Sequence, residues 1–526
     1  MCKRVIAFLV MCTLLISIVT ACGPKKQVIG NVDFSVVEGL EGELCSKEPL
    51  TLTIHMHNGQ FGAFDNEKWT IYHDAARRTN ITLNGTVSTA VSDGNTAFNL
   101  MLLDEKLPDI IFNTSGAVLN NAGMNEGALI PLEEYVTNPD VMPNLARIYQ
   151  EHPEYLAAIT AADGHVYFCP KIREPGPTQV WFVRTDWQQK LGIESPKTLE
   201  EFVHVMDAIR NGDPNGNGKK DEIPYFGNIK HLFYFFGMNG FRYFDVDSND
   251  VFYIPAMTEE YKQALITIAD WYKEGYIDQE IWTRKDPKTE LWGSNKGAMT
   301  VNWVASTMSY NQNIKNIPGF RVDVIAPPSN IMGEAYCHTP GDTVSNVGWG
   351  ISVDNQHVAE TLKYFDFWYS DAGSLLNAMG VEGRDFYYDE NGGAKYTELA
   401  MTYDGGAAAY VRTIGCHEIG YYMRQKWLDA GMDEDGAKAL RMYQTEIRTC
   451  DLVPMVSFTV EEQKIYDEKW ANCQDYIDTY QQKVILGTIN VEETWDDYIA
   501  QLKQRGCDEV TRVYNTAYGR YKANIK

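Results

Sequence analysis

The chain has 526 residues, with 46 Lys and Arg against 71 Asp and Glu, which gives a formal charge of −25. Hydrophobic residues make up 44% and charged residues 22%, a balance that excludes a largely disordered chain. The acidic excess argues against a nucleic-acid-binding protein, which needs a basic surface. The length predicts either two large lobes or roughly two to four domains of about 150 residues each.

Residues 1–21 have the pattern of an export signal. Lys3 and Arg4 precede an apolar run that is too short for an ordinary transmembrane helix. Small residues then precede Cys22, as in a bacterial lipobox, where the thiol takes a diacylglycerol and the chain is cut before the cysteine. An ordinary secretory signal with an incidental cysteine is the alternative. Cleavage removes two basic residues and no acidic one, so the formal charge of the mature chain becomes −27.

We expect residues 22–47 to form a lipidated tether between the membrane and the body of the protein. No other stretch approaches the ~20 apolar residues that a membrane span requires. Of the ten cysteines, two lie in the signal and one would carry the lipid, and the chain has no CxxC motif. We therefore expect free buried thiols rather than a disulfide framework, with one or two bridges left open.

Alternating strand-like and helix-like segments predict an α/β fold. The predicted elements, in chain order, are a strand over 50–56, helices over 67–80 and 96–106, a strand over 109–113, a helix over 198–212, strands over 297–303, 321–326 and 348–353, and helices that begin after Thr459 and at Asn490. Thr198 with Glu201 and Thr459 with Glu462 have the spacing of helix caps. Gly506 is predicted to end the last of these helices.

The segment DPNGNGKKDE, residues 213–222, resembles the first part of an EF-hand loop. Oxygen-bearing side chains stand at loop positions 1, 3, 5 and 9, and glycine stands at position 6. Calcium prefers six to eight oxygen ligands, which such spacing can direct at one centre. The loop departs from an EF-hand at position 12, which is Pro224, so Glu222 would supply the late carboxylate. A polar turn that closes the preceding helix is the alternative.

Several segments, taken in order, identify a resemblance. They are the lipobox, the loop DPNGNGKKDEIP after a capped helix, the strand GAMTVNW, the segment VGWGISV with the helix that follows it, and the late segment ILGTINVEETWDDYIAQLKQRG. Together they resemble the extracellular solute-binding lipoproteins of carbohydrate ABC importers, of the family 1 type. The similarity is strongest to the calcium-containing subgroup that binds alginate oligosaccharides, and it covers roughly residues 48–526.

This resemblance implies a two-lobe periplasmic-binding-protein-like fold, α/β in class, with strands that cross the hinge and a ligand cleft between the lobes. By analogy, lobe one comprises 48–168 plus 327–378, and lobe two comprises 169–326 plus 379–526. The resemblance also implies a structural Ca²⁺ site. Its ligands would be Asp213, Asn215, Asn217, the Lys219 carbonyl, Asp221 and Glu222.

A sugar site needs aromatic platforms for the apolar faces of the rings and a few fixed polar groups for the hydroxyls. We predict Trp181, Trp303 and Trp349 as platforms, because each lies next to a strand end or among small residues. Asn58, Arg384 and Tyr387 are the predicted hydrogen-bonding groups. Each has an ordinary alternative: the tryptophans as core residues, Arg384 in a salt bridge that braces one lobe, and Asn58 as the end of a strand.

We therefore expect a monomeric binding protein, not an enzyme, that captures an oligosaccharide and delivers it to an ABC transporter permease. It would be anchored through Cys22 on the outer face of the cytoplasmic membrane and would bind no nucleic acid. No motif such as GxSxG or HExxH supports an enzyme. An exported peptide-binding or sensor lipoprotein and an exported glycosidase or lyase are the alternatives. The charge of −27 favours a neutral ligand over a polyanion.

Overall fold

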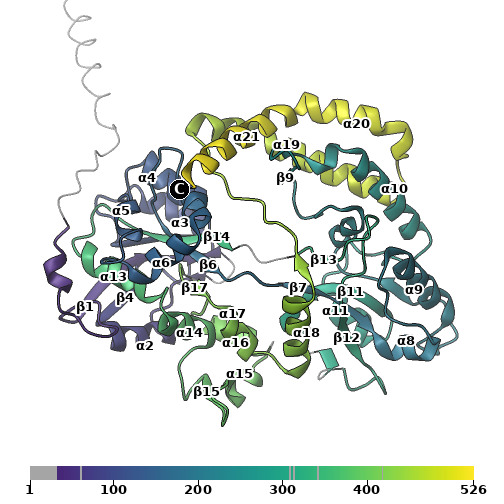
Figure 1. Ribbon diagram of the computed structural model, residues 1–526, viewed down its shortest axis with the longest axis horizontal. Helices are drawn as coiled ribbons and strands as arrows, with labels where there is room; N and C mark the ends of the chain where they lie inside the picture. The colour runs from purple at the N-terminus through teal and green to yellow at the C-terminus, as the bar shows by residue number, and fades with distance from the viewer. Residues whose placement is uncertain are drawn as a thin grey trace, which may run out of the picture.

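The computed structural model describes residues 32–59, 62–306, 310–311, 314–339, 343–404, 406–417 and 419–525. They form two lobes, each built on its own sheet, with long C-terminal helices that run along one side of both (Figure 1). The expected α/β, two-lobe architecture is confirmed. The signal and Cys22 lie outside the described residues.

The first lobe contains a sheet of mixed direction. Its strands, in spatial order, are β17 (Tyr422–Met423), β6 (Cys169–Arg173), β14 (Val344–Ile351), β5 (Ile110–Asn113), β1 (Leu50–His55) and β4 (Ile81–Gly85). Strands β4, β1 and β5 are parallel, whereas β14 runs antiparallel to both β5 and β6. The late strand β14 therefore lies between two early strands and joins them into one sheet.

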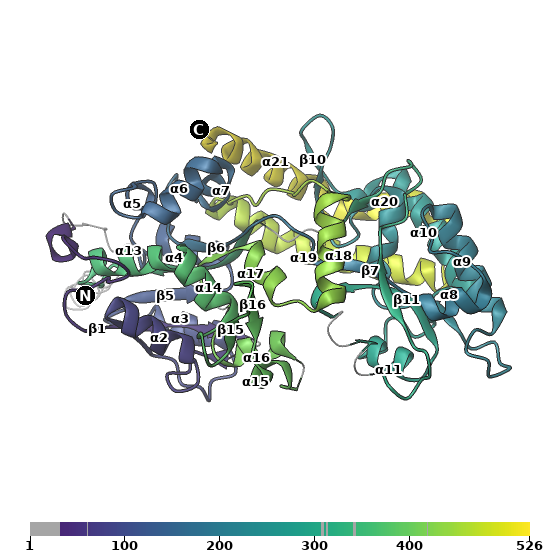
Figure 2. The same cartoon turned by 60° about the horizontal axis from the view of Figure 1, so that its bottom comes forward.

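Helices cover both faces of this sheet (Figures 1 and 2). In the described part of the first lobe they are η1 (Phe34–Val37), α2 (Thr70–Thr79), α3 (Gly94–Met101), α4 (Gly116–Met124), α5 (Glu133–Val136), α6 (Pro143–Glu151), α7 (Pro153–Ile159), α13 (Val358–Phe367), α14 (Asp371–Met379), α15 (Glu398–Met401), α16 (Ala407–Thr413) and α17 (Gln425–Ala430). Two small ribbons accompany them, β2 (His57–Asn58) with β3 (Gly62–Ala63), and β15 (Phe386–Tyr388) with β16 (Ala394–Tyr396).

The second lobe contains a sheet in the order β12 (Val322–Ile325), β7 (Gln179–Arg184), β11 (Gly297–Trp303) and β8 (Ile223–Tyr225). Around it lie α8 (Thr185–Leu191), α9 (Leu199–Gly212), η3 (Ile229–Phe236), η4 (Pro255–Met257), α10 (Glu259–Lys273), α11 (Pro287–Gly293), η5 (Val304–Ser306) and α18 (Glu434–Thr445). Two further ribbons are β9 (Asp245–Val246) with β10 (Phe252–Tyr253), and β13 (Tyr336–Cys337) with β18 (Arg448–Thr449).

Three C-terminal helices complete the molecule: α19 (Val460–Ile485), α20 (Val491–Arg505) and α21 (Cys507–Asn524). Their apolar faces belong to the core of the second lobe. Helix α19 packs on α10, and α21 packs on α19 and also reaches α7 of the first lobe. Figure 1 shows this group, in yellow, spanning the space above both lobes.

The expected boundaries of the lobes and of the tether are wrong at four places. Residues 169–173, expected in the second lobe, form β6 of the first sheet. Residues 379–423 belong to the first lobe, because β17 pairs with β6 and Tyr421 lies in the core of that lobe. Tyr336 packs instead in the core of the second lobe. The expected tether over 22–47 is also shorter than we predicted, because the Phe34 ring contacts Tyr135 and Cys45 is buried in the first core. Each lobe is thus assembled from separate stretches of chain.

The predicted N-terminal caps of α9, α19 and α20 are confirmed, with one difference, whereas the helices expected over 67–80 and 96–106 are α2 (Thr70–Thr79) and α3 (Gly94–Met101). Thr459 and Glu462 form a complete capping box at α19. At α9 the Thr198 hydroxyl accepts the Glu201 backbone N–H at 3.1 Å, but the Glu201 carboxylate accepts from Lys197 N instead of from the cap residue. Gly506 ends α20 in the left-handed region, with φ of 100°, where a residue without Cβ is favoured.

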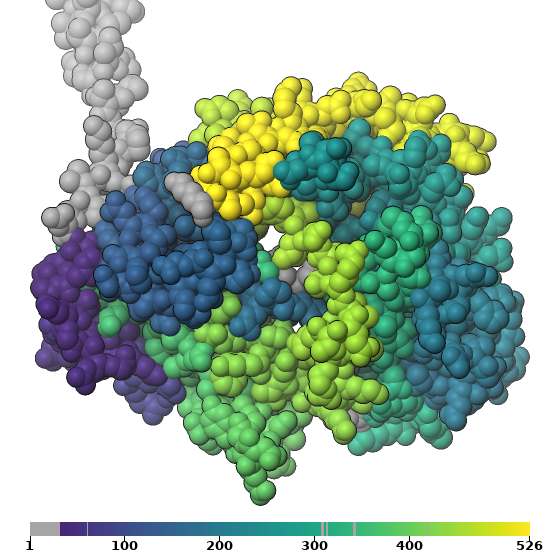
Figure 3. Space-filling model, viewed as in Figure 1, coloured from purple at the N-terminus to yellow at the C-terminus, as the bar shows by residue number. Residues whose placement is uncertain are grey.

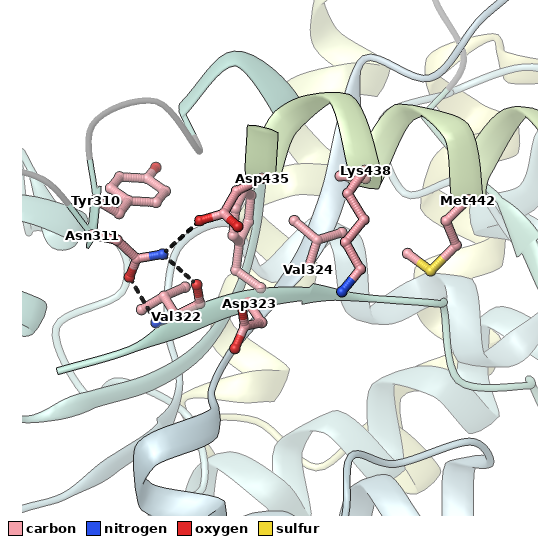
Figure 4. Close-up of a pocket in the computed structure, with 10 residues that line it drawn as sticks. Tyr310, Asn311, Val322, Asp323, Val324, Asp435, Lys438 and Met442 are labelled. Carbon is pink, nitrogen blue, oxygen red and sulfur yellow. Dashed lines mark hydrogen bonds between the residues drawn. The ribbon is translucent and has the colours of Figure 1, made fainter. Parts of the chain in front are cut away.

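After α17 of the first lobe, the chain passes back into the second lobe as α18. This helix packs against the edge strand β12 (Figure 4). The Asn311 carboxamide accepts from Val322 N and donates to Val322 O, both at 2.9 Å, and it also donates to Asp435 of α18 at 3.3 Å. The adjoining cavity has a volume of about 50 Å³, little more than the share of one water molecule in the liquid. This junction is therefore a structural contact and is too small to hold a sugar.

Trp349 tests the packing of the first lobe. It is fully buried on β14 and stacks on Phe365 of α13, with ring centroids 4.4 Å apart. We expect Trp349→Ala to lower the free energy of unfolding by about 3–5 kcal/mol, because the cavity left behind cannot close fully. Urea unfolding followed by circular dichroism measures the change. Trp303→Ala, at a side chain that is 55% exposed, should change it by less than about 0.5 kcal/mol, and equal losses in both would contradict this account.

Candidate functional site

A cavity of about 1270 Å³ lies between the two lobes, large enough for a drug-sized ligand or a short oligosaccharide. One side consists of α3 and α4 of the first lobe, and the other consists of residues 241–244, the start of α19 and Tyr514 of α21. Helix α4 follows directly on β5, so the cavity borders the carboxyl ends of the parallel strands, where α/β proteins commonly bind ligands. In Figure 3 the surface is open between the lobes, beside the yellow-green segment that leads to α19.

Aromatic rings form the wall of this cavity on the side of the second lobe. We call this set the aromatic wall: Phe244, Phe458, Tyr466, Trp470 and Tyr514. The rings contact one another, with centroids 3.9 Å apart for Phe244 and Tyr514 and 4.5 Å apart for Phe244 and Trp470. Phe244 and Trp470 are buried in the second core and support the half-buried rings of Phe458, Tyr466 and Tyr514, so the exposed parts of these three form a preformed apolar surface.

Five carboxamide side chains lie among apolar residues on the opposite wall, on the first lobe. They are Asn99 of α3, Asn120 and Asn121 of α4, and Asn125 and Asn346 close by. Asn120 is 94% buried; its amide donates to the Ser457 hydroxyl at 3.5 Å, whereas its Oδ1 has no partner among the described protein atoms. A buried acceptor of this kind is suited to a hydroxyl donor from a ligand.

Gly116, the first residue of α4, lets this wall approach the sheet closely. A Cβ at this position would lie 2.7 Å from the Phe168 ring and 3.3 Å from Asn346 Oδ1. Any larger residue would therefore push the start of α4 into the cavity. The Ser115 hydroxyl caps the helix by accepting from Val118 N at 3.4 Å.

The charged residues that line the cavity are nearly balanced in sign. They are Glu126, Arg242, Lys464, Asp467 and Glu468. Arg242 already donates to the Asp451 carbonyl at 2.8 Å and lies 3.7 Å from Asp245, and Lys464 lies 3.9 Å from Glu468. No cluster of basic side chains without acidic partners is therefore found among the described lining residues.

The cavity is crossed by a segment that the sequence analysis did not single out. Residues 450–459, which we call the interlobe strap, have no regular secondary structure and connect β18 to α19. Its middle lines the cavity, and its Ser457 carbonyl accepts from Arg520 at 2.9 Å. The strap has no helical or strand-like periodicity, so the sequence signal available was only its apolar composition ahead of the Thr459 cap.

Two of the predicted platforms are wrong. Trp181 is 1% exposed, and its ring lies among Phe202, Phe235 and other residues of the second core. Trp349 is 0% exposed in the first core. Both take the ordinary role of a tryptophan in an apolar strand, so neither presents a ring face to a ligand.

The other four predicted ligand residues do not line the cavity. Trp303 is exposed at the end of β11, where it pairs with Gln179, the first residue of β7 after the chain crosses between the lobes. The Arg384 guanidinium donates two hydrogen bonds to the carboxylate of the buried Asp385, at 2.6 and 2.7 Å. This ion pair is the alternative role predicted for Arg384, a salt bridge within one lobe. Asn58 is half-buried on β2, and Tyr387 is exposed on the β15 ribbon. The ligand roles of these four residues stay predictions.

In the calcium-like loop, side-chain oxygens accept hydrogen bonds from backbone N–H groups of the same loop. The Asp213 carboxylate accepts from Asn217 N and Gly218 N, each at 3.0 Å. Asn215 Oδ1 accepts from Asn217 N at 2.9 Å, and Asn217 Oδ1 accepts from Lys219 N at 2.7 Å. The side chains that we predicted as ligands therefore surround one short loop, which follows α9 and precedes β8.

The buried carboxylate of Glu222 is the strongest evidence for a cation site at this loop. Its side chain is 99% buried, and neither carboxylate oxygen has a hydrogen-bond partner among the described protein atoms. Burial raises the pKa of the Glu222 carboxyl, the nearby backbone N–H groups of Glu222 and Asn215 oppose this rise, and the Asp213 and Asp221 carboxylates add to it. Hydrogen bonds from Asn217, Lys296 and Asn215 lower the pKa of Asp221 to about 2. A buried carboxylate without a hydrogen-bond partner, beside other oxygen donors, fits a hard cation.

The predicted donor set does not consist of carboxylates alone. In the described residues no group of three or more His, Cys, Asp and Glu side chains converges as a metal site. Two carboxamides and the Lys219 carbonyl would have to complete the set. Lys296 Nζ also lies 3.0 Å from Asp221, so a bound cation would compete with this ion pair.

None of the described helices is both long enough and apolar enough to cross a membrane.

The chain was compared with known protein families, curated proteins and solved structures. A family model described as bacterial extracellular solute-binding protein matches residues 70–383, and one described as a domain of unknown function matches residues 454–523.

The fructooligosaccharide ABC transporter substrate-binding protein FusA of Streptococcus pneumoniae is 27% identical over 98% of each chain. Lipoprotein LipO of Bacillus subtilis is 23% identical over 81% of this chain and 84% of its own. Among solved structures, the alginate-binding protein AlgQ2 without calcium ion superposes with a TM-score of 0.75 at 29% identity, covering 91% of this chain and 100% of that one. FusA in complex with kestose superposes with a TM-score of 0.69 at 26% identity, covering 90% and 100%.

Glu222→Gln tests the cost of the buried carboxylate. Because the pKa of Glu222 is raised in the folded protein, its ionisation disfavours folding, and stability falls as the pH rises through the interval between its unfolded and folded pKa values. Gln does not titrate. In chelator at neutral pH, we expect the variant to have a free energy of unfolding higher by about 1–3 kcal/mol, with the difference disappearing at acidic pH.

Urea unfolding at a series of pH values measures this difference. Asp221→Asn, at a carboxylate whose pKa is lowered instead of raised, serves as the control and should not stabilise the protein. A Glu222→Gln variant less stable than wild type throughout would contradict the role of the orphaned carboxylate.

Proposed function

The chain belongs to the family of bacterial extracellular solute-binding proteins, and we propose that it captures an oligosaccharide between its two lobes and delivers it to the permease of an ABC transporter. The observation that carries this proposal is the pairing of an aromatic wall on one lobe with a carboxamide wall on the other. A sugar ring has apolar C–H faces and a rim of hydroxyls, so it is complementary to both walls at once. The fructooligosaccharide named for FusA, the kestose in its complex and the alginate named for AlgQ2 support a carbohydrate.

We propose further that the ligand is uncharged. Acidic oligosaccharides need cationic partners, most effectively the bidentate contacts of arginine. Arg242, the arginine that lines the described cavity, is already engaged by Asp245 and by the Asp451 carbonyl. The formal charge of −27 would also slow the approach of a polyanion. Carboxamides, in contrast, both donate to and accept from neutral hydroxyls.

Binding would act by closing the lobes, with no covalent step. The ligand would touch both walls, so it would favour the closed arrangement by its extra contacts there. Trp303, exposed near the segment that crosses between the lobes, is the proposed additional platform. Asn58 of β2, Arg384 and Tyr387 of β15 remain secondary candidates from the first lobe.

We also propose that the loop at 213–222 holds a structural Ca²⁺ and that Cys22 carries a lipid. The donors would be Asp213, Asn215, Asn217, the Lys219 carbonyl, Asp221 and Glu222, and the ion would neutralise the buried Glu222 carboxylate. An EF-hand mutant of FusA exists among the structural relatives, and LipO is named a lipoprotein. Lipidation of Cys22 would keep the protein, as a monomer, at the outer face of the cytoplasmic membrane.

The ligand site is tested by Asn120→Ala and Tyr466→Ala. We expect the loss of one hydrogen bond or one stacking surface to weaken binding of an uncharged oligosaccharide such as kestose by about 5- to 30-fold. Trp303→Ala should weaken it as well. Isothermal titration calorimetry measures the affinity, with oligogalacturonate as the charged comparison ligand.

Tyr388→Ala is the matched control, because this tyrosine is exposed on β15 away from the cavity. Unchanged affinity in both cavity variants, at full folding, would remove the cavity from consideration as the binding site. Preferential binding of oligogalacturonate would reverse the assignment of charge.

The proposed calcium site is tested by measuring the effect of calcium on the melting temperature of the wild-type protein and of the Glu222→Gln variant. An ion that binds only the folded state stabilises it by mass action, so calcium should raise the melting temperature of the wild-type protein and chelator should lower it. The variant loses one charged ligand, so its calcium-dependent rise should be smaller. Differential scanning calorimetry in calcium and in chelator gives both shifts, and no calcium-dependent shift in the wild type would refute the site.

A further inference from the structure

One arginine of α21 holds the end of the interlobe strap. Arg520 donates to the Ser457 carbonyl at 2.9 Å and to the Glu462 carboxylate of α19, through Nη1 at 2.9 Å and also through Nη2. The Arg520 side chain is 30% exposed and that of Glu462 is 14% exposed, so solvent screens this contact less than it screens a fully exposed pair. A guanidinium carries several donors in one plane, which lets it bind a carbonyl and a carboxylate at once.

The rest of the strap has few attachments to the backbone of its neighbours. At its start, Cys450 N donates to the Cys337 carbonyl at 3.0 Å, and Arg242 donates to the Asp451 carbonyl at 2.8 Å. For residues 452–456 no hydrogen bond is found within the described part of the chain. The position of this apolar middle therefore depends on how the two ends of the strap are held.

The middle of the strap packs against both lobes. Met455 contacts the first core, whereas Val453 and Val456 contact the second. All three side chains line the cavity. Apolar contacts have no preferred direction, so they alone do not fix the register of an irregular segment between two lobes. Fixed hydrogen bonds at its ends supply that register.

Ser457 connects the arginine contact to both walls of the cavity. Its carbonyl accepts from Arg520, and its hydroxyl accepts from Asn120 of the first lobe at 3.5 Å. The next residue, Phe458, belongs to the aromatic wall, and its ring centroid lies 5.1 Å from that of Tyr514. A shift of Ser457 would therefore displace a ring on one wall and remove a hydrogen-bond partner from the other.

We propose that Arg520 is a positioning residue for the oligosaccharide site, because it fixes the interlobe strap on the C-terminal helices and so places Ser457 and Phe458 in the cavity. The inference rests on the proposed function, since Arg520 itself does not line the cavity. An ion pair with Glu462 alone would only brace α21 against α19. The bond to the Ser457 carbonyl is the contact that gives Arg520 its role at the site.

Arg520→Met tests the proposal, because it keeps the length of the side chain and removes every donor. Limited digestion of the full chain with chymotrypsin reports how accessible the strap is, since Leu452 and Phe458 are cleavage sites within it. We expect cleavage within the strap to become about 5- to 20-fold faster, and kestose to bind about 3- to 10-fold more weakly by calorimetry. Arg520→Lys, which keeps a single ammonium group, should give values between those of the methionine variant and the wild type.

Two variants on the same helix serve as controls. Arg512 is exposed and has no ion pair among the described residues, so Arg512→Met removes the same charge and should change neither measurement. Val510 is buried in the second core, so Val510→Ala should lower the melting temperature but leave strap cleavage and kestose affinity unchanged.

Strap cleavage no faster in Arg520→Met than in these controls would overturn the proposal, and so would faster cleavage with unchanged kestose affinity. The digestion needs no ligand, so it separates this inference from the proposed function. If the wild-type protein bound no kestose, faster cleavage of Arg520→Met would still support the anchor, and the failure would fall on the proposed ligand.

Discussion

The contact of the C-terminal helices with both lobes is the constraint on which the interlobe site depends. Helix α19 contributes Tyr466 and Trp470 to the aromatic wall, and α21 contributes Tyr514 and reaches across to α7 of the first lobe. The strap carries Phe458 between them and touches Asn120 through Ser457. The aromatic wall is thus neither a part of the second sheet nor a mobile loop; a helical pair that both lobes support positions it.

A second constraint is electrostatic and lies far from the cavity. The chain places a carboxylate, Glu222, in a buried position immediately before β8, at the edge of the second sheet. Loop carboxamides and backbone N–H groups satisfy Asp213 and Asp221, whereas the Glu222 carboxylate has no hydrogen-bond partner among the described residues. Burial of this carboxylate is the unfavourable interaction that the proposed cation would relieve.

The fold was more predictable than the site, for physical reasons. Helix α9 and strand β11 carry strong local signals, a cap with a 3.6-residue stripe and a short apolar run, and the structure has both close to the expected bounds. Trp181 and Trp349 carry no local signal that separates a core ring from a platform, because burial depends on which distant helix covers the strand. The strap has no periodicity at all, and the carboxamides of α4 become a wall only when the lobes meet. The region 379–423 was misassigned because β17 pairs over a long sequence separation, which no local pattern encodes.

The central place of β14 has a consequence for how the protein is made. Strand β5 ends at residue 113, but its neighbour in the sheet is complete only at residue 351, and β17 at the far edge arrives at residue 423. During synthesis the first lobe therefore has an open sheet, with β5 and β6 unpaired along the edges that β14 will later occupy, until more than two hundred further residues have been added. Such late, long-range pairing folds slowly and leaves aggregation-prone edges exposed. The first lobe, although it contains the earliest strands, can therefore complete its sheet only after every strand of the second sheet has been made.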